Sequence, residues 1–361
     1  MTARLRTQLT ESLLIPLLAV LSGLLLASIF VLMAGVSPLT AYVEMFKSGF
    51  SCVQLTRCNL FQTLQLATPL MLTGLSAVVA FRSGMFNLGQ EGQFLIGAVV
   101  AAWLGIAIHL PPVLHPLVII LASMAAAGAY GWLPGMLKVR LGVNEVITTI
   151  IMNNIANLFA IYVVNFPLRA DASTTARSPM VDASAQLPVF FQGSKWGMGF
   201  VLALAAAYLV YLYLWRSVPG YEQRMSGQAP LFARYGGIRS DRAAIRGMVL
   251  SGALAGLAGA IELLGVHRRL LQGFSTGLGF DGVLVSILGR THPLGVVLVS
   301  ILFAGVRLGA QIGLQTSVHI PRELGGGIIA LIILFVAAEK FYAGWIGRVK
   351  SWFGRSDKMK G

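Results

Sequence analysis

The chain has 361 residues, of which 56% are hydrophobic and 11% are charged. A soluble domain carries roughly 25% charged residues, so the composition excludes an ordinary soluble protein and predicts an integral membrane protein. The formal net charge is +14. In a soluble protein such a charge would suggest a nucleic-acid partner, but in a membrane protein we expect none. What matters instead is how the Lys and Arg residues are divided between the two sides of the bilayer.

Apolar runs of about 20 residues are long enough to cross a bilayer as helices. The first run follows Arg4 and Arg6, as in a signal peptide, but its length and the absence of a cleavage site favour a retained helix. A shorter run near residues 278–290 begins at Asp281 and ends at Arg290, and we expect a short helix within a packed bundle. The long runs lie near residues 13–34, 61–81, 88–108, 113–134, 145–165, 197–216, 244–264, 293–312 and 326–345.

The distribution of basic residues supports ten spans with both termini in the cytoplasm. This topology puts 18 Lys and Arg residues inside and 8 outside, with Arg307 within a span, in agreement with the positive-inside rule. We therefore expect an all-α, polytopic membrane protein that forms one transmembrane domain over residues 1–361. Its other parts are external loops at about 35–60 and 166–196, a cytoplasmic loop at about 217–243 and a cytoplasmic tail at 346–361.

Both cysteines, Cys52 and Cys58, fall in the first external loop. We favour a disulfide bond formed in an oxidising periplasm or cell exterior, and two free thiols are the alternative. No Cys and His residues have the spacing of a zinc site, so we expect no bound metal.

A polar, glycine-rich stretch, Phe81–Gly97, lies between two of the apolar runs. It carries Asn87, Gln90, Glu91 and Gln93. Polar groups at membrane depth are costly and usually face a bundle interior or a water-filled path. They are candidates for the wall of a solute path. The alternative is hydrogen bonding between helices at a broken helix, where glycines let the backbones approach closely.

A second polar series comprises Asn144, Glu145, Asn153 and Asn157. Helical spacing predicts that Asn153 and Asn157 point the same way. Amides offer neutral hydrogen-bond partners to sugar hydroxyls and base edges, so these residues are also candidates for the path. Cross-bracing between helices is an equal alternative.

No catalytic or ATP-binding group can be assigned. The chain has no Gly-Lys dipeptide and hence no Walker A sequence, so we expect no enzyme activity and no cofactor on this chain. Carboxylates within the spans are few, whereas ion-coupled carriers need several near the midplane. If transport is active, ATP and Mg²⁺ are expected on another subunit.

The cytoplasmic loop contains the segment 227–238, GQAPLFARYGGI. Pro230 near its start and Gly236 at its end predict a short amphipathic helix. Its apolar face could enter a groove in a soluble partner or lie on the lipid surface. The residues assigned to this contact are Gln228, Pro230, Leu231, Phe232, Arg234 and Tyr235.

Taken together, these segments are specific enough to indicate a family. The sequence resembles the permease subunits of ABC importers for nucleosides and simple sugars, within the broader group of ribose and branched-chain amino-acid permeases. The loop departs from the family form G-x-N-P-x-A-A-R-Y-A-G-I, because the Asn is lost and Gly236 replaces Ala. The matching stretches are 68–75 (TPLMLTGL), 86–93 (FNLGQEGQ), 142–153 (GVNEVITTIIMN), 250–259 (LSGALAGLAG), 280–295 (FDGVLVSILGRTHPLG) and 321–324 (PREL).

This resemblance implies a ten-helix permease fold with short and broken helices, in a bacterial inner membrane. It also implies cytoplasmic ABC ATPase subunits, a second permease subunit and an external solute-binding protein. A heterodimer of permeases is favoured over a homodimer. The implied solute is a nucleoside or simple sugar. The alternatives are another small polar solute such as a branched-chain amino acid, an ion-coupled secondary carrier, and a membrane scaffold without transport.

Overall fold

The computed structural model describes residues 21–54, 57–170, 175–191 and 194–315, together with positions 327, 330 and 331. Apart from those three positions, the expected span near 326–345, the motif at 321–324 and the tail at 346–361 lie outside the described residues.

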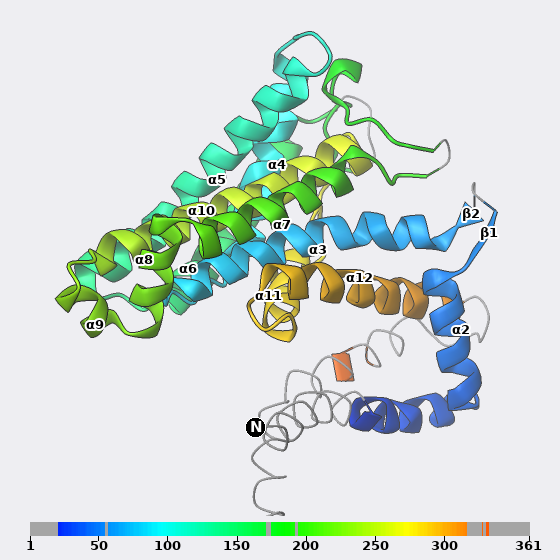
Figure 1. Ribbon diagram of the computed structural model, residues 1–361. Coiled ribbons are helices and arrows are strands. Elements are labelled where there is room, and N and C mark those ends of the chain that lie inside the picture. The colour runs from blue at the N-terminus through cyan, green and yellow to red at the C-terminus, as the bar shows by residue number, and fades with distance from the viewer. Residues whose placement is uncertain are drawn as a thin grey trace, which may run out of the picture. The chain divides into compact units, whose positions relative to one another are not determined.

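The helices follow the apolar runs (Figure 1). Seven of those described are long and apolar enough to cross a membrane, so the chain is an all-α, polytopic membrane protein. An eighth crossing is possible if a bent pair of helices counts as one span. The seven are α3 (Asn59–Arg82), α4 (Gln90–Ala107), α5 (Leu114–Leu141), α6 (Glu145–Asn165), α7 (Met198–Arg216), α10 with η2 (Ser240–His267) and α12 with η3 (Pro293–Leu314).

Three shorter helices interrupt this pattern. The expected short helix near 278–290 is α11 (Leu278–Leu288). The loop expected in the cytoplasm contains two helices, α8 (Val218–Gln228) and α9 (Pro230–Tyr235), of which only the second was predicted. Sequence reasoning missed α8 because it is polar and lacks a strong apolar stripe.

The chain folds into two compact units, residues 1–51 with 306–361 and residues 52–305. In the first unit, the helix Leu21–Met33 meets α2 (Pro38–Phe50) at 108°. The external loop expected from about residue 35 therefore contains a helix, which begins at Pro38, a residue well suited to a first helical turn. Gly313 packs closely on α2, because a Cβ there would stand 2.8 Å from Ser48 Oγ.

The second unit is built around α10, which packs against α5, α3 and α4. Small residues allow this close approach. A Cβ on Gly97 of α4 would stand 2.5 Å from the Cα of Gly256, and Gly256 also faces Ser123 of α5. The Gly252–Gly256 pair thus marks a packing seam between helices, as small residues do in membrane bundles.

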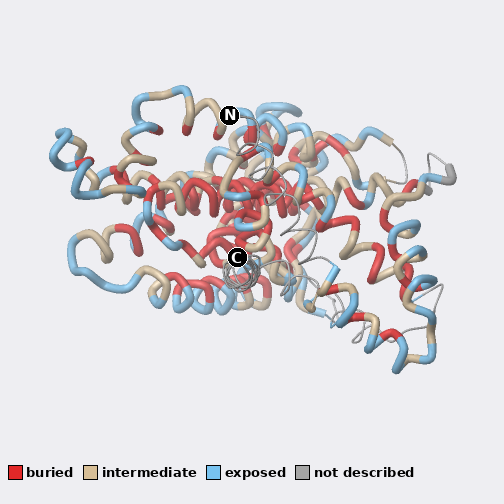
Figure 2. Tube along the Cα trace, turned by 60° about the horizontal axis from the view of Figure 1, so that its bottom comes forward, coloured by how far each residue is buried: buried red, intermediate tan, exposed pale blue. Residues whose placement is uncertain are grey.

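Burial separates central from peripheral helices in this unit. In the most apolar window of each helix, 78% of α3 and 72% of α10 is buried, against 33% of α5 and 28% of α7. Figure 2 shows buried positions concentrated where helices run against one another and exposed positions along the connecting loops. The exposed faces of α5, α6 and α7 are largely apolar, as contact with lipid requires.

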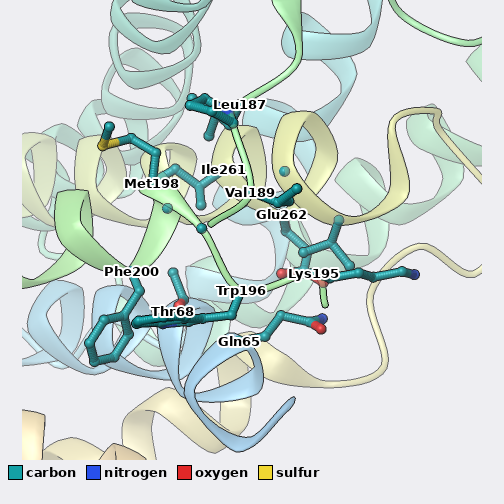
Figure 3. A pocket seen from close by; sticks show the side chains of 15 residues that line it. Gln65, Thr68, Leu187, Val189, Lys195, Trp196, Met198, Phe200, Ile261 and Glu262 are labelled. Carbon is teal, nitrogen blue, oxygen red and sulfur yellow. The ribbon is translucent and has the colours of Figure 1, made fainter. Parts of the chain in front are cut away.

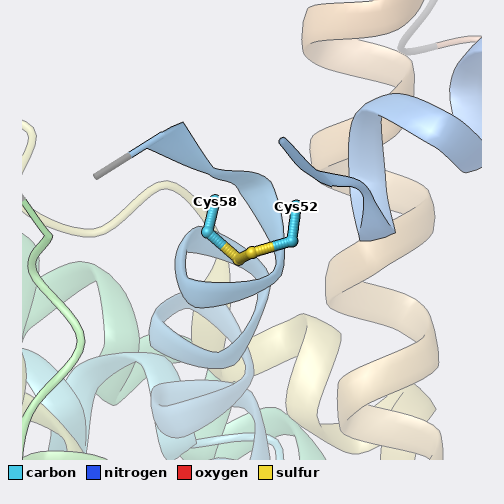
Figure 4. Close-up of a disulfide and its surroundings, with 2 residues drawn as sticks. All are labelled: Cys52 and Cys58. Carbon is cyan, nitrogen blue, oxygen red and sulfur yellow. A yellow bond between two sulfur atoms is a disulfide. The ribbon is translucent and has the colours of Figure 1, made fainter. Parts of the chain in front are cut away.

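A two-stranded hairpin is a small exception to the all-helical fold. β1 (Cys52–Gln54) pairs antiparallel with β2 (Arg57–Cys58), and Cys52 lies opposite Cys58. The two cysteines are joined in a disulfide bond directly before α3 (Figure 4).

Candidate functional site

The polar stretch forms the turn between α3 and α4. Gly84 has a φ of +76°, a conformation that favours glycine. Asn87 then closes the turn, because its side-chain Oδ1 accepts a hydrogen bond from the Gly89 nitrogen at 2.8 Å. This local bond is typical of Asn in turns, and it places α4 to begin at Gln90.

Asn87 is also the centre of a buried polar network. Its Nδ2 donates to Gln93 Oε1 at 3.1 Å and to Ser251 Oγ at 2.8 Å. Ser251 in turn contacts Ser76, whose hydroxyl donates to the Ser251 carbonyl at 2.7 Å. All four side chains are buried. The network therefore joins α3, α4 and α10 at the broken helix.

Asn153 of α6 clamps the start of α4. Its Oδ1 accepts from the Gly92 nitrogen at 2.8 Å, and its Nδ2 donates to the Leu88 carbonyl at 2.8 Å. Both backbone groups belong to the end of the turn or the first turn of α4, where helix termini leave groups unpaired. Asn153 is 6% exposed, so its amide pairs with these two backbone groups in a largely buried region.

Glu91 is tied to α11. Its Oε2 accepts from the Gly279 nitrogen at 2.8 Å, which lies in the first turn of that helix, where a carboxylate is favoured. Thr73 of α3 adds a second contact through a hydrogen bond to the Leu278 carbonyl at 3.1 Å. The short helix is thus held at its N-terminal end by polar side chains from α3 and α4.

Gln90 differs from its neighbours. It is fully buried, yet neither its Oε1 nor its Nε2 has a hydrogen-bond partner among the described residues. A buried polar group without a partner is costly. Gln90 consequently has hydrogen-bonding capacity that its described neighbours leave unused.

The remaining candidates lie apart from this network. Asn144 caps α6, with its Oδ1 accepting from Val146 N at 2.9 Å, and Glu145 pairs with Lys138 at 2.9 Å. Asn157 is exposed while Asn153 is buried. Asn153 and Asn157 therefore do not share an environment. The buried face of α6 is centred near Ala156 and includes Asn153, whereas Asn157 lies beyond the edge of that face.

The amphipathic helix expected within residues 227–238 is α9, which begins at Pro230 and is followed by Gly236. Its apolar face is open: Leu231 is 71%, Phe232 65% and Tyr235 92% exposed. Arg234 beside it pairs with Asp241 at 3.2 Å. Gln228 ends α8, also exposed.

The preceding helix, α8, anchors α9 to the bundle. Gln223 of α8 is fully buried; its Nε2 donates to the Val79 carbonyl of α3 at 2.7 Å, and its Oε1 accepts from Tyr213 at 2.7 Å. A recess of about 420 Å³ lies beside this junction, with Gly84, Gly227, Leu231 and other residues in its wall. The broken-helix turn and the α8–α9 segment therefore adjoin directly.

At the opposite end of the helices, the segment between α6 and α7 packs against η2, where the Leu187 nitrogen donates to the Leu264 carbonyl at 3.2 Å. The ring of Trp196 stacks on Phe61 of α3 with centroids 4.9 Å apart. A small cavity of about 20 Å³ lies beside it, close to the buried Glu262 (Figure 3). This is room for about one water. Glu262 lies 3.4 Å from His267 across a π-helical turn, Leu263–His267, and the cavity is too small for a solute.

Residues 273–277 have the letters G-x-S-x-G of a nucleophile elbow, although no catalytic group was expected from the sequence. Such an elbow requires a strand before the Ser and a helix after it. Here the segment is a turn between η2 and α11, so the letters carry no catalytic geometry. The described residues also contain no cluster of His, Cys, Asp and Glu able to hold a metal ion.

Known proteins resemble this chain over most of its length. Residues 59–337 match the family described as the permease component of branched-chain amino acid transport systems. The guanosine ABC transporter permease protein NupP of Bacillus subtilis (strain 168) is 34% identical over 347 residues, covering 94% of this chain and 97% of that protein.

Two further relatives extend the range of named solutes. The nucleoside ABC transporter permease protein NupB of Lactococcus lactis subsp. cremoris (strain MG1363) is 31% identical and covers 91% of this chain and 92% of that protein. The glucose ABC transporter permease protein TsgB13 of Haloferax volcanii is 28% identical and covers 91% of this chain and 87% of that protein. No solved structure matches the chain.

Proposed function

The chain belongs to the permease family of branched-chain amino acid transport systems and is a permease subunit of an ABC importer, and from this we propose that it carries a nucleoside or a simple sugar across the membrane. The observation that carries the proposal is the similarity over more than nine-tenths of the chain to permeases named for guanosine and nucleosides. A nucleoside is favoured over a sugar, because the relative named for glucose is less similar, at 28% identity.

The polar residues divide into bracing and solute-facing groups. Buried hydrogen bonds within the chain engage the side-chain amides of Asn87, Gln93 and Asn153, which supports a role for these residues in shaping the turn. Among the described residues, the buried amide of Gln90 has no hydrogen-bond partner, and Asn157 is exposed. We infer that these two amides face the solute path, where a nucleoside or sugar needs neutral donors and acceptors.

Energy for transport comes from partner subunits. The exposed face of α9 is the surface for cytoplasmic ABC ATPase subunits, since Leu231, Phe232 and Tyr235 form a short apolar face suited to a groove. ATP and Mg²⁺ bind those subunits and not this chain. A second permease subunit, in a heterodimer, and an external solute-binding protein complete the importer.

The proposed orientation places α9 in the cytoplasm and the Cys52–Cys58 hairpin outside, in the inner membrane of a bacterium. The disulfide supports this side, because such bonds persist in oxidising compartments. Both termini are then cytoplasmic.

Reconstituted transport tests the proposal. The chain is co-purified with its ATPase and second permease, placed in vesicles and supplied with binding protein, ATP and labelled guanosine, uridine or glucose. ATP-dependent uptake of one of these solutes is the expected result. Uptake that follows an ion gradient without any ATPase would instead identify a secondary carrier and refute the proposal.

A further inference from the structure

Two arginines meet on one aromatic ring at the end of the bundle that carries α8. The guanidinium carbon of Arg82, the last residue of α3, lies 5.3 Å from the ring centroid of Trp215, near the end of α7. The guanidinium carbon of Arg224, on α8, lies 5.5 Å from the same ring. We call these residues, with His292, the Arg82–Arg224 cluster.

The cluster lacks a counter-charge in the described part of the chain. Neither guanidinium forms an ion pair there. The carboxylate two residues from Arg224, Glu222, pairs with Arg246 instead, at 3.2 Å. Stacking on Trp215 stabilises each cation, but it does not remove the repulsion between two like charges.

The cluster also has hydrogen-bond donors left over. Arg82 uses its Nε on the Thr291 carbonyl at 3.1 Å, which leaves its terminal nitrogens. The Nε of Arg224 is buried and has no partner among the described residues. A guanidinium presents five N–H donors in a planar fork that matches phosphate oxygens.

His292 contributes a further donor. Its ring centroid lies 4.8 Å from that of Trp215, and its Nδ1 accepts from the Leu294 nitrogen at 3.3 Å. The neutral ring therefore carries its proton on Nε2. Burial, and then the positive charge of Arg82, lower the pKa of His292, which favours this neutral form at pH 7.

The position of the cluster is that of the membrane surface. Arg82 ends a membrane-length helix, and Trp215 lies next to the end of another. Tyr211 stacks on Trp215 with centroids 5.8 Å apart. Trp and Tyr gather where the hydrocarbon meets the headgroups, and basic pockets between helices at the cytoplasmic face suit lipid headgroups.

We propose that the Arg82–Arg224 cluster binds the phosphate of an anionic phospholipid from the cytoplasmic leaflet. The phosphate supplies the missing negative charge and accepts from the guanidinium donors of both arginines. Because the cluster joins α3, α7, α8 and the turn before α12, a bound headgroup fixes α8 against the bundle. The cluster contains none of the residues proposed for the solute path, so the inference does not depend on which solute is carried.

Lipid retention tests the site. The full chain is purified in nanodiscs of phosphatidylcholine, with and without phosphatidylglycerol, and bound lipid is counted by native mass spectrometry. We expect wild type to retain phosphatidylglycerol and Arg224→Gln to retain about tenfold less. A tenfold difference is what the loss of one charge-assisted hydrogen bond would produce. The matched control is Arg242→Gln, which removes an exposed charge outside the cluster and should retain the lipid as wild type does.

A second measurement separates a lipid from free phosphate. Phosphatidylglycerol should raise the melting temperature of wild type and of Arg242→Gln, and raise that of Arg224→Gln less. If Arg224→Gln fails to insert, Arg224→Lys keeps the charge, loses the planar fork and should show the same deficit. Equal retention and equal stabilisation in the Arg224 variants would overturn the site. If inorganic phosphate raises the melting temperature equally in nanodiscs of phosphatidylcholine alone, the bound phosphate group does not come from a lipid.

Discussion

Gly227 and Gly84 are in direct backbone contact. A Cβ on Gly227 would stand 2.7 Å from the Gly84 nitrogen, and one on Gly84 would stand 3.0 Å from the Gly227 Cα. Gly227 lies at the end of α8, next to α9, and Gly84 opens the turn that leads to Asn87. A displacement of α9 can therefore reach the buried amide network without an intervening side chain.

The variant Gly227→Ala tests this contact. The added methyl group must push on the backbone of residues 82–84, so we expect a loss of about 1–3 kcal/mol in stability, as overpacking costs, and a larger loss of ATP-driven uptake. Melting temperature and vesicle uptake measure the two effects. Gly236→Ala is the matched control, since its nearest neighbour would be 3.5 Å away. Wild-type uptake by Gly227→Ala would refute the link.

The double variant Arg234→Glu with Tyr235→Ala should abolish co-purification of the ATPase while the chain still inserts in the membrane. Tyr235 is almost fully exposed, and the Arg234–Asp241 ion pair is exposed as well, so we expect the bundle to stay folded. The control Arg242→Glu makes the same charge change outside α9. Normal assembly of the double variant would exclude α9 as the docking surface.

Asn153 and Asn157 should differ in their effect on stability. Asn153→Ala leaves the Gly92 nitrogen and the Leu88 carbonyl without their partner, and we expect a loss of about 1–3 kcal/mol for a buried group left unpaired. Asn157→Ala removes an exposed side chain and should stay within about 0.5 kcal/mol. Thermal unfolding in detergent compares the pair, and equal losses would contradict the assignment of Asn153 as a brace.

Gln90 and Gln93 provide a second matched pair. Gln93→Ala breaks the bond to Asn87 and should lower the melting temperature. Gln90→Ala removes an amide that has no partner among the described residues, so it should lower the melting temperature less than Gln93→Ala does and raise the solute concentration needed for half-maximal uptake. Unaltered uptake kinetics in Gln90→Ala would remove Gln90 from the proposed path.

Cys52 and Cys58 should react with a membrane-impermeant maleimide only after reduction, because both sulfurs are in the disulfide. Intact cells and right-side-out vesicles show whether the hairpin is external. The Cys52→Ser and Cys58→Ser double variant controls for background labelling. Labelling of wild type without reductant would show that the bond is absent in the membrane.

Local features of the sequence predicted most of the helices. Apolar runs mark α3 to α7, α10 and α12, because a bilayer demands about 20 apolar residues for each crossing. Pro230 and Gly236 predicted the ends of α9. Proline favours a helix start and glycine a helix end through their own backbone conformations, so no distant partner is needed. The α2 and α8 helices were missed. One lies within an expected loop, and the other has no apolar stripe.

Partners distant in sequence could be identified only from the tertiary structure. The sequence placed Asn87, Glu91 and Asn153 among polar groups at membrane depth, and it left open whether they face a solute or brace helices. Packing of α10 and α11 brings Ser251 to Asn87 and Gly279 to Glu91, across more than 150 residues of chain. A side chain's hydrogen-bond partner depends on which helices pack together, and no local pattern encodes that choice. The sequence alone determined that the chain crosses a membrane, because crossing depends on the summed hydrophobicity of consecutive residues.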